Sequence, residues 1–308
     1  MRAATFAAVV ILGFLAGRGH AAQYTQLVDF GDSLSDAGNM FALTGQPPSP
    51  PYFQGRASDG PVWVERLAPL LGVAVPRASA LGGPDGTDFA YFGSRTTGGN
   101  APSVQQQVAA YLAHATPTGR ELFTIQGGAD DFANGALDPA APANSIRDDI
   151  GTLIAAGGRN FVVLNLPPLG LTPLFRGTPL QQAVTGLSDA YDATLATDLA
   201  GLRTVHPDVV ITEVNLDGLF RQVIADPARY GLTNVTDPAL SGDPPTPVPN
   251  PDRYLFWDQG HPTATGQERL AEAVTAAVPE PDTLCLLLVL VLRVPGIGPG
   301  RRVRKQVS

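Results

Sequence analysis

Cysteine and lysine are almost absent from this chain of 308 residues, and the one copy of each lies near its carboxyl end, at Cys285 and Lys305. The chain can therefore form no internal disulfide. A body without lysine offers no amine for Schiff-base chemistry or for a serine–lysine pair. With four histidines and no cysteine in the body, the usual ligand sets of a structural zinc site are missing, so we expect no metal.

Charged residues are also few, at 16% of the chain, against 44% hydrophobic residues. This composition is typical of a folded protein rather than a disordered one. The formal net charge is −8, so carboxylates are in excess. Nucleic-acid binding depends on Lys and Arg side chains that face phosphates, and we therefore expect no nucleic-acid partner.

Residues 1–22 have the pattern of a secretory signal peptide. A basic start at Arg2 precedes an apolar run from Ala3 to Ala16, and small residues follow at the expected cleavage point, Ala21 or Ala22. A membrane-spanning helix is the alternative, but it needs about 20 apolar residues and this run is shorter. We therefore expect an exported bacterial protein.

Residues 278–308 form a tail of unusual composition. Val278-Pro279-Glu280-Pro281 precedes an apolar run from Leu284 to Leu292, and a basic cluster that includes Arg301 and Arg302 follows. An apolar run followed by basic residues is typical of a stop-transfer segment. The tail resembles the PEP-CTERM sorting signal of some Gram-negative bacteria, although Arg293 interrupts the apolar run. Transient membrane attachment through this tail is one prediction, and an unstructured basic tail is the alternative.

Between these ends, residues 23–277 alternate between two kinds of apolar segment. The short runs rich in β-branched residues indicate buried strands at Gln26–Phe30, Leu122–Ile125, Phe161–Leu166 and Val209–Val214. Helical spacing indicates helices at Val62–Leu71, Val104–Ala113, Ile146–Ala156, Leu187–Leu202 and Ala264–Ala276. This alternation predicts an α/β fold with a central parallel sheet covered on both faces. The Pro-rich segments Pro47–Pro51 and Asp243–Pro251 are predicted surface loops, so we predict a single domain.

The segment Phe30–Asn39, with the sequence FGDSLSDAGN, follows the first predicted strand directly. In open α/β sheets, ligands bind beyond the carboxyl ends of the strands. A serine in a turn between strand and helix is exposed there, so Ser33 is a candidate nucleophile. The alternative is that Ser33 or Ser35 only caps a helix, and this segment alone does not decide between the two.

The segment Phe256–Thr263, with the sequence FWDQGHPT, precedes the last predicted helix and carries Asp258 and His261. A serine hydroxyl is a weak nucleophile that needs a base, and the base needs a partner that orients it and stabilises its charged form. Asp258 can orient His261, and His261 can take the proton of Ser33. The pair alone is weak evidence, but together with the Ser33 turn it becomes much stronger.

These two segments resemble the first and last blocks of the GDSL family of lipases and esterases, also called SGNH hydrolases. Residues 165–173 and 230–236 further resemble the branch of bacterial secreted phospholipases, lecithinases and haemolysins. The resemblance implies a three-layer α/β/α, flavodoxin-like fold and hydrolysis of carboxylic esters through an acyl-enzyme. It implies Ser33, Asp258 and His261 as catalytic residues, with no cofactor. The expected partners are small-molecule or lipid esters, and we expect a monomer.

The resemblance also implies an oxyanion hole with three donors. The first is the backbone N–H of Ser33. The second is the N–H of Gly93, because Phe89–Ser94 aligns with the second block of the family; an ordinary tight turn is the other interpretation of Gly93. The third donor is an asparagine amide in the family, but this chain has Asp130 at that position. An ionised carboxylate only accepts hydrogen bonds and would repel the oxyanion.

Three outcomes are open for Asp130. Burial near Asp131 can raise its pKa so that the protonated carboxyl group donates, or a nearby amide such as that of Asn134 can replace it. Otherwise activity is low or absent, because the loss of one donor costs about 3 kcal/mol. The last outcome leads to an alternative function, a catalytically weak or inactive surface protein that binds lipid or glycan.

Overall fold

The structure is a computed structural model, and it describes residues 24–83 and 86–279. The predicted signal peptide, residues 1–22, lies outside the described residues, and the predicted sorting tail lies outside them from residue 280 onward. Within the described ranges, none of the helices is long and apolar enough to cross a membrane.

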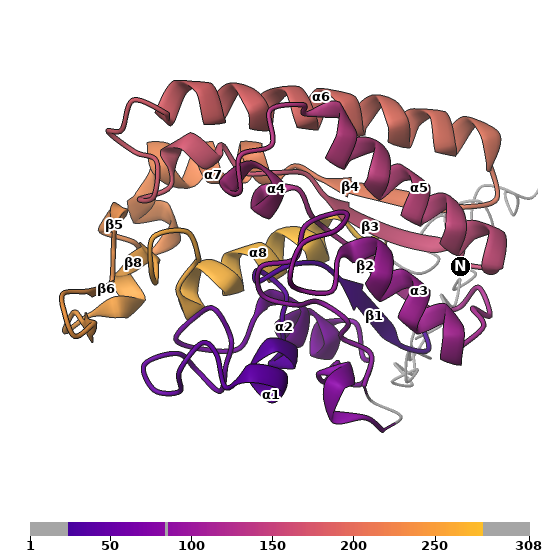
Figure 1. Cartoon of the computed structure of the whole chain (residues 1–308), viewed down its shortest axis with the longest axis horizontal. Coiled ribbons are helices and arrows are strands. Elements are labelled where there is room, and N and C mark those ends of the chain that lie inside the picture. Colours follow the sequence, from indigo (N-terminus) through magenta and orange to yellow (C-terminus); the bar gives the residue numbers. More distant parts are fainter. Residues whose placement is uncertain (1–23, 84–85, 280–308) are drawn as a thin grey trace, which may run out of the picture.

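A four-stranded parallel sheet lies at the centre of the described chain (Figure 1). Its strands pair in the order β1 (Leu27–Phe30), β2 (Leu122–Ile125), β3 (Asn160–Leu164) and β4 (Val210–Val214). Residues 87–91 extend the sheet beyond β1: Asp29 N–H donates to Thr87 O at 2.9 Å, and Phe89 N–H donates to Asp29 O at 2.8 Å. If this segment is counted as the second strand in sequence, the order is 2-1-3-4-5, which is typical of flavodoxin-like folds.

Helices cover both faces of the sheet, because successive side chains of a strand point to opposite faces and both sets are apolar. Phe123 belongs to the core on one face, and its neighbour Leu122 belongs to the core on the other. The first face carries α3 (Val104–His114), α5 (Ala140–Ala156) and α6 (Gln181–Val205), and the second carries α2 (Trp63–Leu70) and α8 (Ala264–Ala277) (Figure 1). The predicted α/β fold with a central parallel sheet is confirmed.

Shorter elements complete the described chain. They are the helices α1 (Asn39–Thr44), α4 (Ala129–Ala133) and α7 (Leu216–Ala225), the parallel pair β5 (Asn234–Pro238) and β8 (Tyr254–Phe256), the antiparallel pair β6 (Leu240–Ser241) and β7 (Thr246–Pro247), and 3₁₀ helices at Ser79–Leu81, Leu169–Leu171, Pro227–Tyr230 and Pro251–Arg253. The carboxyl ends of parallel strands meet at one edge of a sheet. Residues that follow β1, β2 and β3, such as Ser33, Asp130 and Asn165, therefore share that edge.

Several helices differ from the sequence prediction. Helix α5 begins at Ala140 rather than Ile146, and α6 begins at Gln181 rather than Leu187. The first turn of α5 contains Pro142, which the start of a helix tolerates but which conceals that start in the sequence. The sequence analysis does not identify α1, α4 or α7, which have six, five and ten residues. Helices as short as α1 and α4 show no clear apolar period.

Two buried glutamines fasten the turn after β1 to the helices around it. On α3, Gln107 Oε1 accepts the N–H of Gly31 at 2.9 Å, and Gln107 Nε2 donates to Gly31 O at 2.8 Å. On α8, Gln267 Nε2 donates to Leu34 O at 3.4 Å. An unpartnered buried polar group costs about 1–3 kcal/mol, so these contacts hold the backbone on both sides of Ser33 in place.

Candidate active site

Ser33 lies in a buried turn that follows β1 directly. The turn closes through Asp32, whose backbone O accepts the N–H of Ser35 at 3.2 Å. The Ser35 hydroxyl accepts a hydrogen bond from Trp63 Nε1 at 3.0 Å, so it is committed to the core. The Ser33 hydroxyl, by contrast, contacts His261 and caps no helix, which separates the roles of the two serines.

Asp36 joins this turn to the loop that carries Gly93. Its Oδ1 accepts the N–H of Asn39 at 2.5 Å, and its Oδ2 accepts the N–H of Phe92 at 2.8 Å. Burial raises the pKa of Asp36, while these backbone donors oppose the shift. The ring centroid of Phe92 lies 5.1 Å from that of His261. Asp36 therefore places the Gly93 loop beside the imidazole.

Asp258 and His261 occupy the loop between β8 and α8. Asp258 Oδ1 accepts the backbone N–H groups of Gly260 and His261, both at 2.9 Å, so the loop folds around the carboxylate. His261 Nδ1 lies 2.8 Å from each oxygen of that carboxylate. His261 Nε2 lies 2.8 Å from Ser33 Oγ. The structure thus brings Ser33, Asp258 and His261 together, although 228 positions separate the serine from the histidine.

The charges around His261 favour its protonated form. Burial by itself lowers the pKa of His261, but the carboxylates of Asp258, Asp130 and Asp32 raise it, and the net shift is upward. Asp258 shifts the other way, because burial raises its pKa while the charge and N–H donors of His261 outweigh burial and bring it to about 2. Asp258 is therefore ionised wherever His261 titrates, and it stabilises the imidazolium.

The structure adds Tyr52, a residue that the sequence does not point to. Tyr52 follows the predicted surface loop Pro47–Pro51, and its hydroxyl donates to Asp258 Oδ2 at 2.9 Å. Its ring packs edge-on against Trp257, with centroids 6.3 Å apart. Burial and the charge of Asp258 raise the pKa of Tyr52, so the phenol keeps its proton. A separation of 206 positions leaves no local sequence signal for this contact.

The backbone N–H groups of Ser33 and Gly93 are free to bind a ligand, since neither donates to another group of the described residues. Gly93 has a φ of +83°, which only glycine adopts at little cost. A Cβ at this position would meet no atom within 4 Å, so glycine serves the backbone conformation and not close packing. The turn that was the other interpretation of Gly93 is present, and it leaves the N–H available.

Asp130 lies in the first turn of α4 and lines the same cavity as Ser33 and His261. Burial, together with the nearby carboxylates of Asp32 and Asp131, raises the pKa of Asp130 to about 7, and the charges of His261 and Arg95 oppose this shift. A protonated form of the carboxyl group is therefore accessible near neutral pH. In that form it has an O–H to donate.

The amide of Asn134 is used elsewhere. Its Nδ2 donates to the backbone O of Asp130 at 2.7 Å, from an exposed position at the end of α4. One N–H of this amide is thus in use, and Asn134 does not line the cavity beside Ser33, so the structure gives no support to Asn134 as the oxyanion donor. Asp131 is also committed, because its carboxylate accepts the N–H and the hydroxyl of Thr96 at 2.9 and 3.1 Å. This contact holds the loop after Gly93 against α4.

A cavity of about 210 Å³ borders Ser33. Ser33, Asp130 and His261 line this cavity, and most of its other lining residues are apolar. The cavity extends to α7, β8 and α8, and its lining there includes Leu216, Leu219, Phe220, Val223, Phe256 and Leu270. The reactive groups therefore open onto an apolar space, which no single sequence motif indicates.

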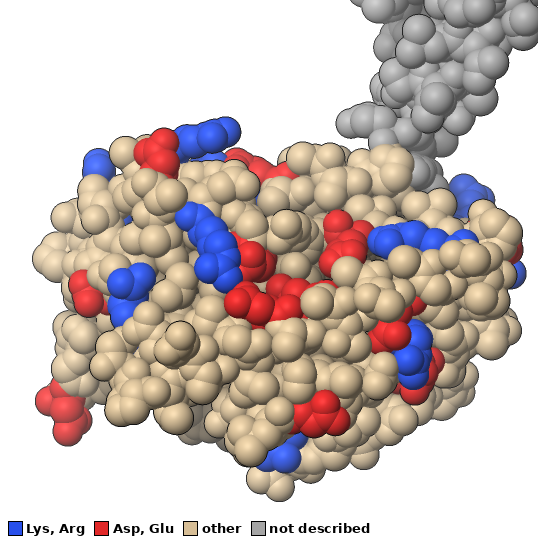
Figure 2. Space-filling view, turned by 90° about the horizontal axis from the view of Figure 1, so that it is seen from above, with Lys and Arg blue, Asp and Glu red and all other residues tan. Residues whose placement is uncertain are grey.

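The described ranges contain no group of three or more His, Cys, Asp or Glu side chains that could hold a metal ion. Figure 2 shows the charges on one face of the molecule. Among the described residues on that face, basic and acidic side chains lie intermixed among uncharged residues, with no continuous basic surface.

Replacing Tyr52 by phenylalanine tests the contact with Asp258. Tyr52→Phe removes a donor that spreads the charge of Asp258 Oδ2, so Asp258 holds the imidazolium more strongly and the pKa of His261 should rise. NMR titration of the ring protons measures this shift, with His261→Gln used to assign the signal. Tyr254→Phe, in the same aromatic cluster, is the matched control and should cause no shift. An unchanged or lower pKa of His261 in Tyr52→Phe would contradict the assignment.

Comparison with known proteins finds one matching family and several similar proteins. Residues 27–274 match the model of the GDSL-like lipase/acylhydrolase family. The phosphatidylcholine-sterol acyltransferase of Aeromonas hydrophila is 29% identical over 275 residues, which cover 86% of this chain and 81% of that protein. Esterase EstA of Pseudomonas aeruginosa is 29% identical over 325 residues, which cover 86% of this chain and 48% of that protein, so the chain spans about half the length of EstA.

Among solved structures, Est24, a carbohydrate acetylesterase from Sinorhizobium meliloti, is 17% identical with a TM-score of 0.45, covering 85% of this chain and 99% of that one. The family match is the stronger finding, since it spans both the Ser33 turn and the loop of Asp258 and His261. The chain belongs to the GDSL-like lipase/acylhydrolase family and is an ester hydrolase.

Proposed function

We propose that the chain cleaves carboxylic esters with Ser33 as nucleophile, His261 as general base and acid, and Asp258 as the group that orients His261. The main support is the unbroken series of 2.8 Å contacts from Asp258 through His261 to Ser33 Oγ. Proton transfer to a general base needs heavy atoms about 2.6–3.2 Å apart. Both contacts fall within this range without any movement of the chain.

The proposed reaction has two steps. Ser33 Oγ attacks the carbonyl carbon of the ester while its proton passes to His261 Nε2. The bond to the alcohol then breaks, the alcohol leaves with the proton of His261, and the acyl group remains on Ser33. His261 next removes a proton from water, which attacks the acyl-enzyme. The carboxylic acid leaves as Ser33 Oγ takes its proton back.

The negative charge on the carbonyl oxygen needs donors at fixed positions. We propose that the free N–H groups of Ser33 and Gly93 supply two of them and that the protonated carboxyl group of Asp130 supplies the third. A pKa of about 7 for Asp130 supports this role at neutral and acidic pH. Family membership together with this donor favours an enzyme over an inactive scaffold that binds lipid or glycan.

The cellular context is a further part of the proposal. The basic and apolar pattern of residues 1–22 supports export, and the tail after residue 278 supports transient attachment to a membrane before processing. We propose that the mature chain acts as a monomer on small-molecule or lipid esters, with neither a metal nor a cofactor in the reaction.

Ser33→Ala tests the nucleophile directly. Without Oγ there is no acyl-enzyme, so the rate of hydrolysis of p-nitrophenyl butyrate should fall by at least about 1,000-fold. Ser35→Ala is the matched control, because the Ser35 hydroxyl serves the core through Trp63 and takes no part in the reaction. Hydrolysis by Ser33→Ala at the rate of the unmodified protein would rule out the proposed mechanism.

Asp130→Asn tests the third donor through pH. Above its pKa of about 7, Asp130 loses its O–H and repels the oxyanion, so kcat/KM of the unmodified enzyme should decline as pH rises. The amide of the variant donates at every pH, so the ratio of variant to unmodified enzyme should grow by up to about tenfold per pH unit above 7.

Profiles of kcat/KM from pH 5 to 9 measure both effects. Asp138→Asn removes an exposed carboxylate just beyond α4 and should leave the profile unchanged. If Asp130→Asn also reproduces the profile of the unmodified enzyme, Asp130 does not belong to the oxyanion hole.

A further inference from the structure

We propose that the apolar cavity beside Ser33 binds the acyl chain of the ester and selects chains of about six carbons or more over acetyl groups. This inference rests on the proposed function of Ser33 and names the substrate class for it. The substrates are esters of medium-chain or longer fatty acids, and acetylated glycans are excluded.

The cavity connects the reactive groups with a hydrophobic interior. Ser33 and His261 line it at one end. Leu219, Phe220 and Val223, all on α7, line the same cavity farther along. These three side chains also belong to a hydrophobic cluster that packs around β8. An acyl chain attached at Ser33 Oγ can therefore be buried from water inside the cavity.

The size of the cavity argues against a small acyl group. Its volume is about 210 Å³, whereas an engineered apolar cavity of about 150 Å³ already accommodates benzene, a ligand of six carbons. An acetyl group would leave most of the apolar wall without contact. Each buried methylene raises the affinity for a bound ligand about fourfold. Longer acyl chains should therefore bind to the apolar wall more tightly.

Several polar groups in the wall are already committed to partners within the protein, although Asp32 Oδ2 and Arg269 Nε have no hydrogen-bond partner among the described residues. Gln126 Nε2 donates to Asp32 Oδ1 at 2.6 Å, and Asn165 Oδ1 accepts the N–H of Leu216 at 2.6 Å. Arg269, a further lining residue, forms an ion pair with a glutamate one turn along α8, at 2.6 Å. The lining residues are mostly apolar, so a sugar in the cavity would lose most of its hydrogen bonds to water without replacement, and this loss is costly.

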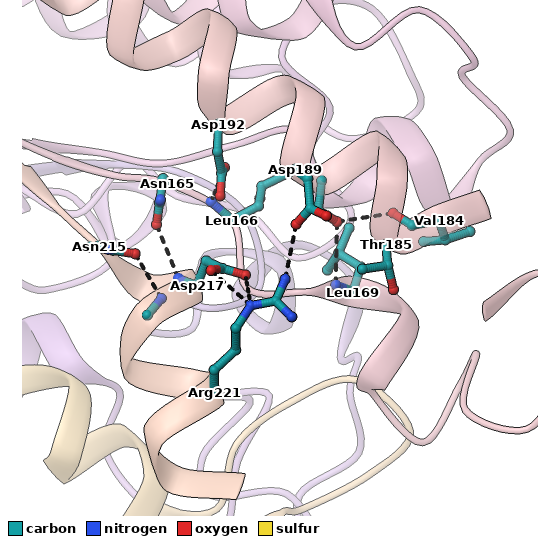
Figure 3. Close-up of polar contacts among 12 residues, drawn as sticks. Asn165, Leu166, Leu169, Val184, Thr185, Asp189, Asp192, Asn215, Asp217 and Arg221 are labelled. Carbon is teal, nitrogen blue, oxygen red and sulfur yellow. Dashed lines mark hydrogen bonds and ion pairs between the residues drawn. The ribbon is translucent and has the colours of Figure 1, made fainter. Parts of the chain in front are cut away.

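The walls of the cavity are held in place by a polar network, which Figure 3 shows. Asp192 on α6 accepts the N–H of Leu166, a lining residue, at 2.9 Å. Arg221 on α7 donates to Asp217 at 2.8 Å on the same helix and to Asp189 on α6 at 3.0 Å (Figure 3). The Asp192 contact joins the segment after β3 to α6, and the exposed ion pair of Arg221 with Asp189 joins α7 to α6. The cavity is present in the chain without a ligand, as is usual for ligand pockets.

The acyl group fits this cavity better than the alcohol does, because of the order of events at Ser33. The alcohol must leave after the first step, while the acyl group stays attached until water cleaves it. An apolar cavity therefore suits the acyl group, which stays attached to Ser33. Its rim includes Leu174, which is exposed and whose N–H donates to Gln259 O at 2.8 Å, next to the loop of His261.

The experiment compares kcat/KM across p-nitrophenyl esters from acetate to decanoate, each below its micelle concentration, and across alkyl acetates from ethyl to octyl. On the acyl side, kcat/KM should rise on the order of 100-fold from acetate to hexanoate, and the alkyl acetates should show no comparable rise. A maximum on acetate, a rise confined to the alcohol series, or faster release of acetate from acetylated xylan would overturn the proposal.

Substitutions in the cavity wall test whether the cavity causes the preference for longer acyl chains. Leu219→Trp fills the cavity, so the ratio of kcat/KM for octanoate to that for acetate should fall at least about tenfold. Leu202→Trp on α6 is the matched control, because Leu202 is a partly buried leucine outside the cavity, and its ratio should not change. Val223→Ala enlarges the cavity and should move the optimum to a longer chain, which keeps the test decisive if Leu219→Trp fails to fold.

The result separates this inference from the mechanism. If Ser33→Ala abolishes hydrolysis but the ratio is the same in Leu219→Trp, Val223→Ala and the unmodified enzyme, the cavity does not bind the acyl chain and the mechanism stands. If Ser33→Ala keeps full activity on every ester, the mechanism itself fails.

Discussion

The hydrogen bond between Ser33 Oγ and His261 Nε2 joins the end of the first strand to the start of the last helix, and the site exists only while both stay in position. Gln107 fixes the backbone before the serine, and Gln267 on α8 fixes the backbone after it. Thr263 caps α8 two residues after His261, accepting the N–H of Gly266. Buried polar contacts of this kind are strong because the surrounding dielectric is low.

The same sheet edge also concentrates negative charge, which links two proton equilibria. Asp258, Asp130 and Asp32 together raise the pKa of His261, and burial with Asp32 raises that of Asp130. In the proposed mechanism, ionisation of Asp130 removes an oxyanion donor and stabilises the imidazolium at the same time. The two groups are therefore expected to titrate as a coupled pair, and in the proposed mechanism the aspartate at position 130 sets the pH range of the site.

The sequence predicts the sheet and the catalytic candidates because both leave local patterns. Four apolar runs mark the strands, and the segments around Ser33 and His261 are recognisable by their spacing. Tyr52 leaves no pattern, because it meets Asp258 only through the fold. The apolar cavity beside Ser33 leaves no sequence pattern either, because leucine and phenylalanine side chains that line a cavity cannot be told from core residues in a sequence. The sequence shows an aspartate at position 130, but the protonation of its carboxyl group depends on burial, which only the structure gives.

The central claim is that Ser33 is the nucleophile of this site. Incubation with a fluorophosphonate, digestion and mass spectrometry of the peptides test it most directly, because the reagent phosphonylates an activated serine oxygen. The account predicts a single adduct on the peptide that contains Ser33, with none when that residue is alanine. An adduct on another residue, or none between pH 5 and 9 with the protein folded, would contradict it.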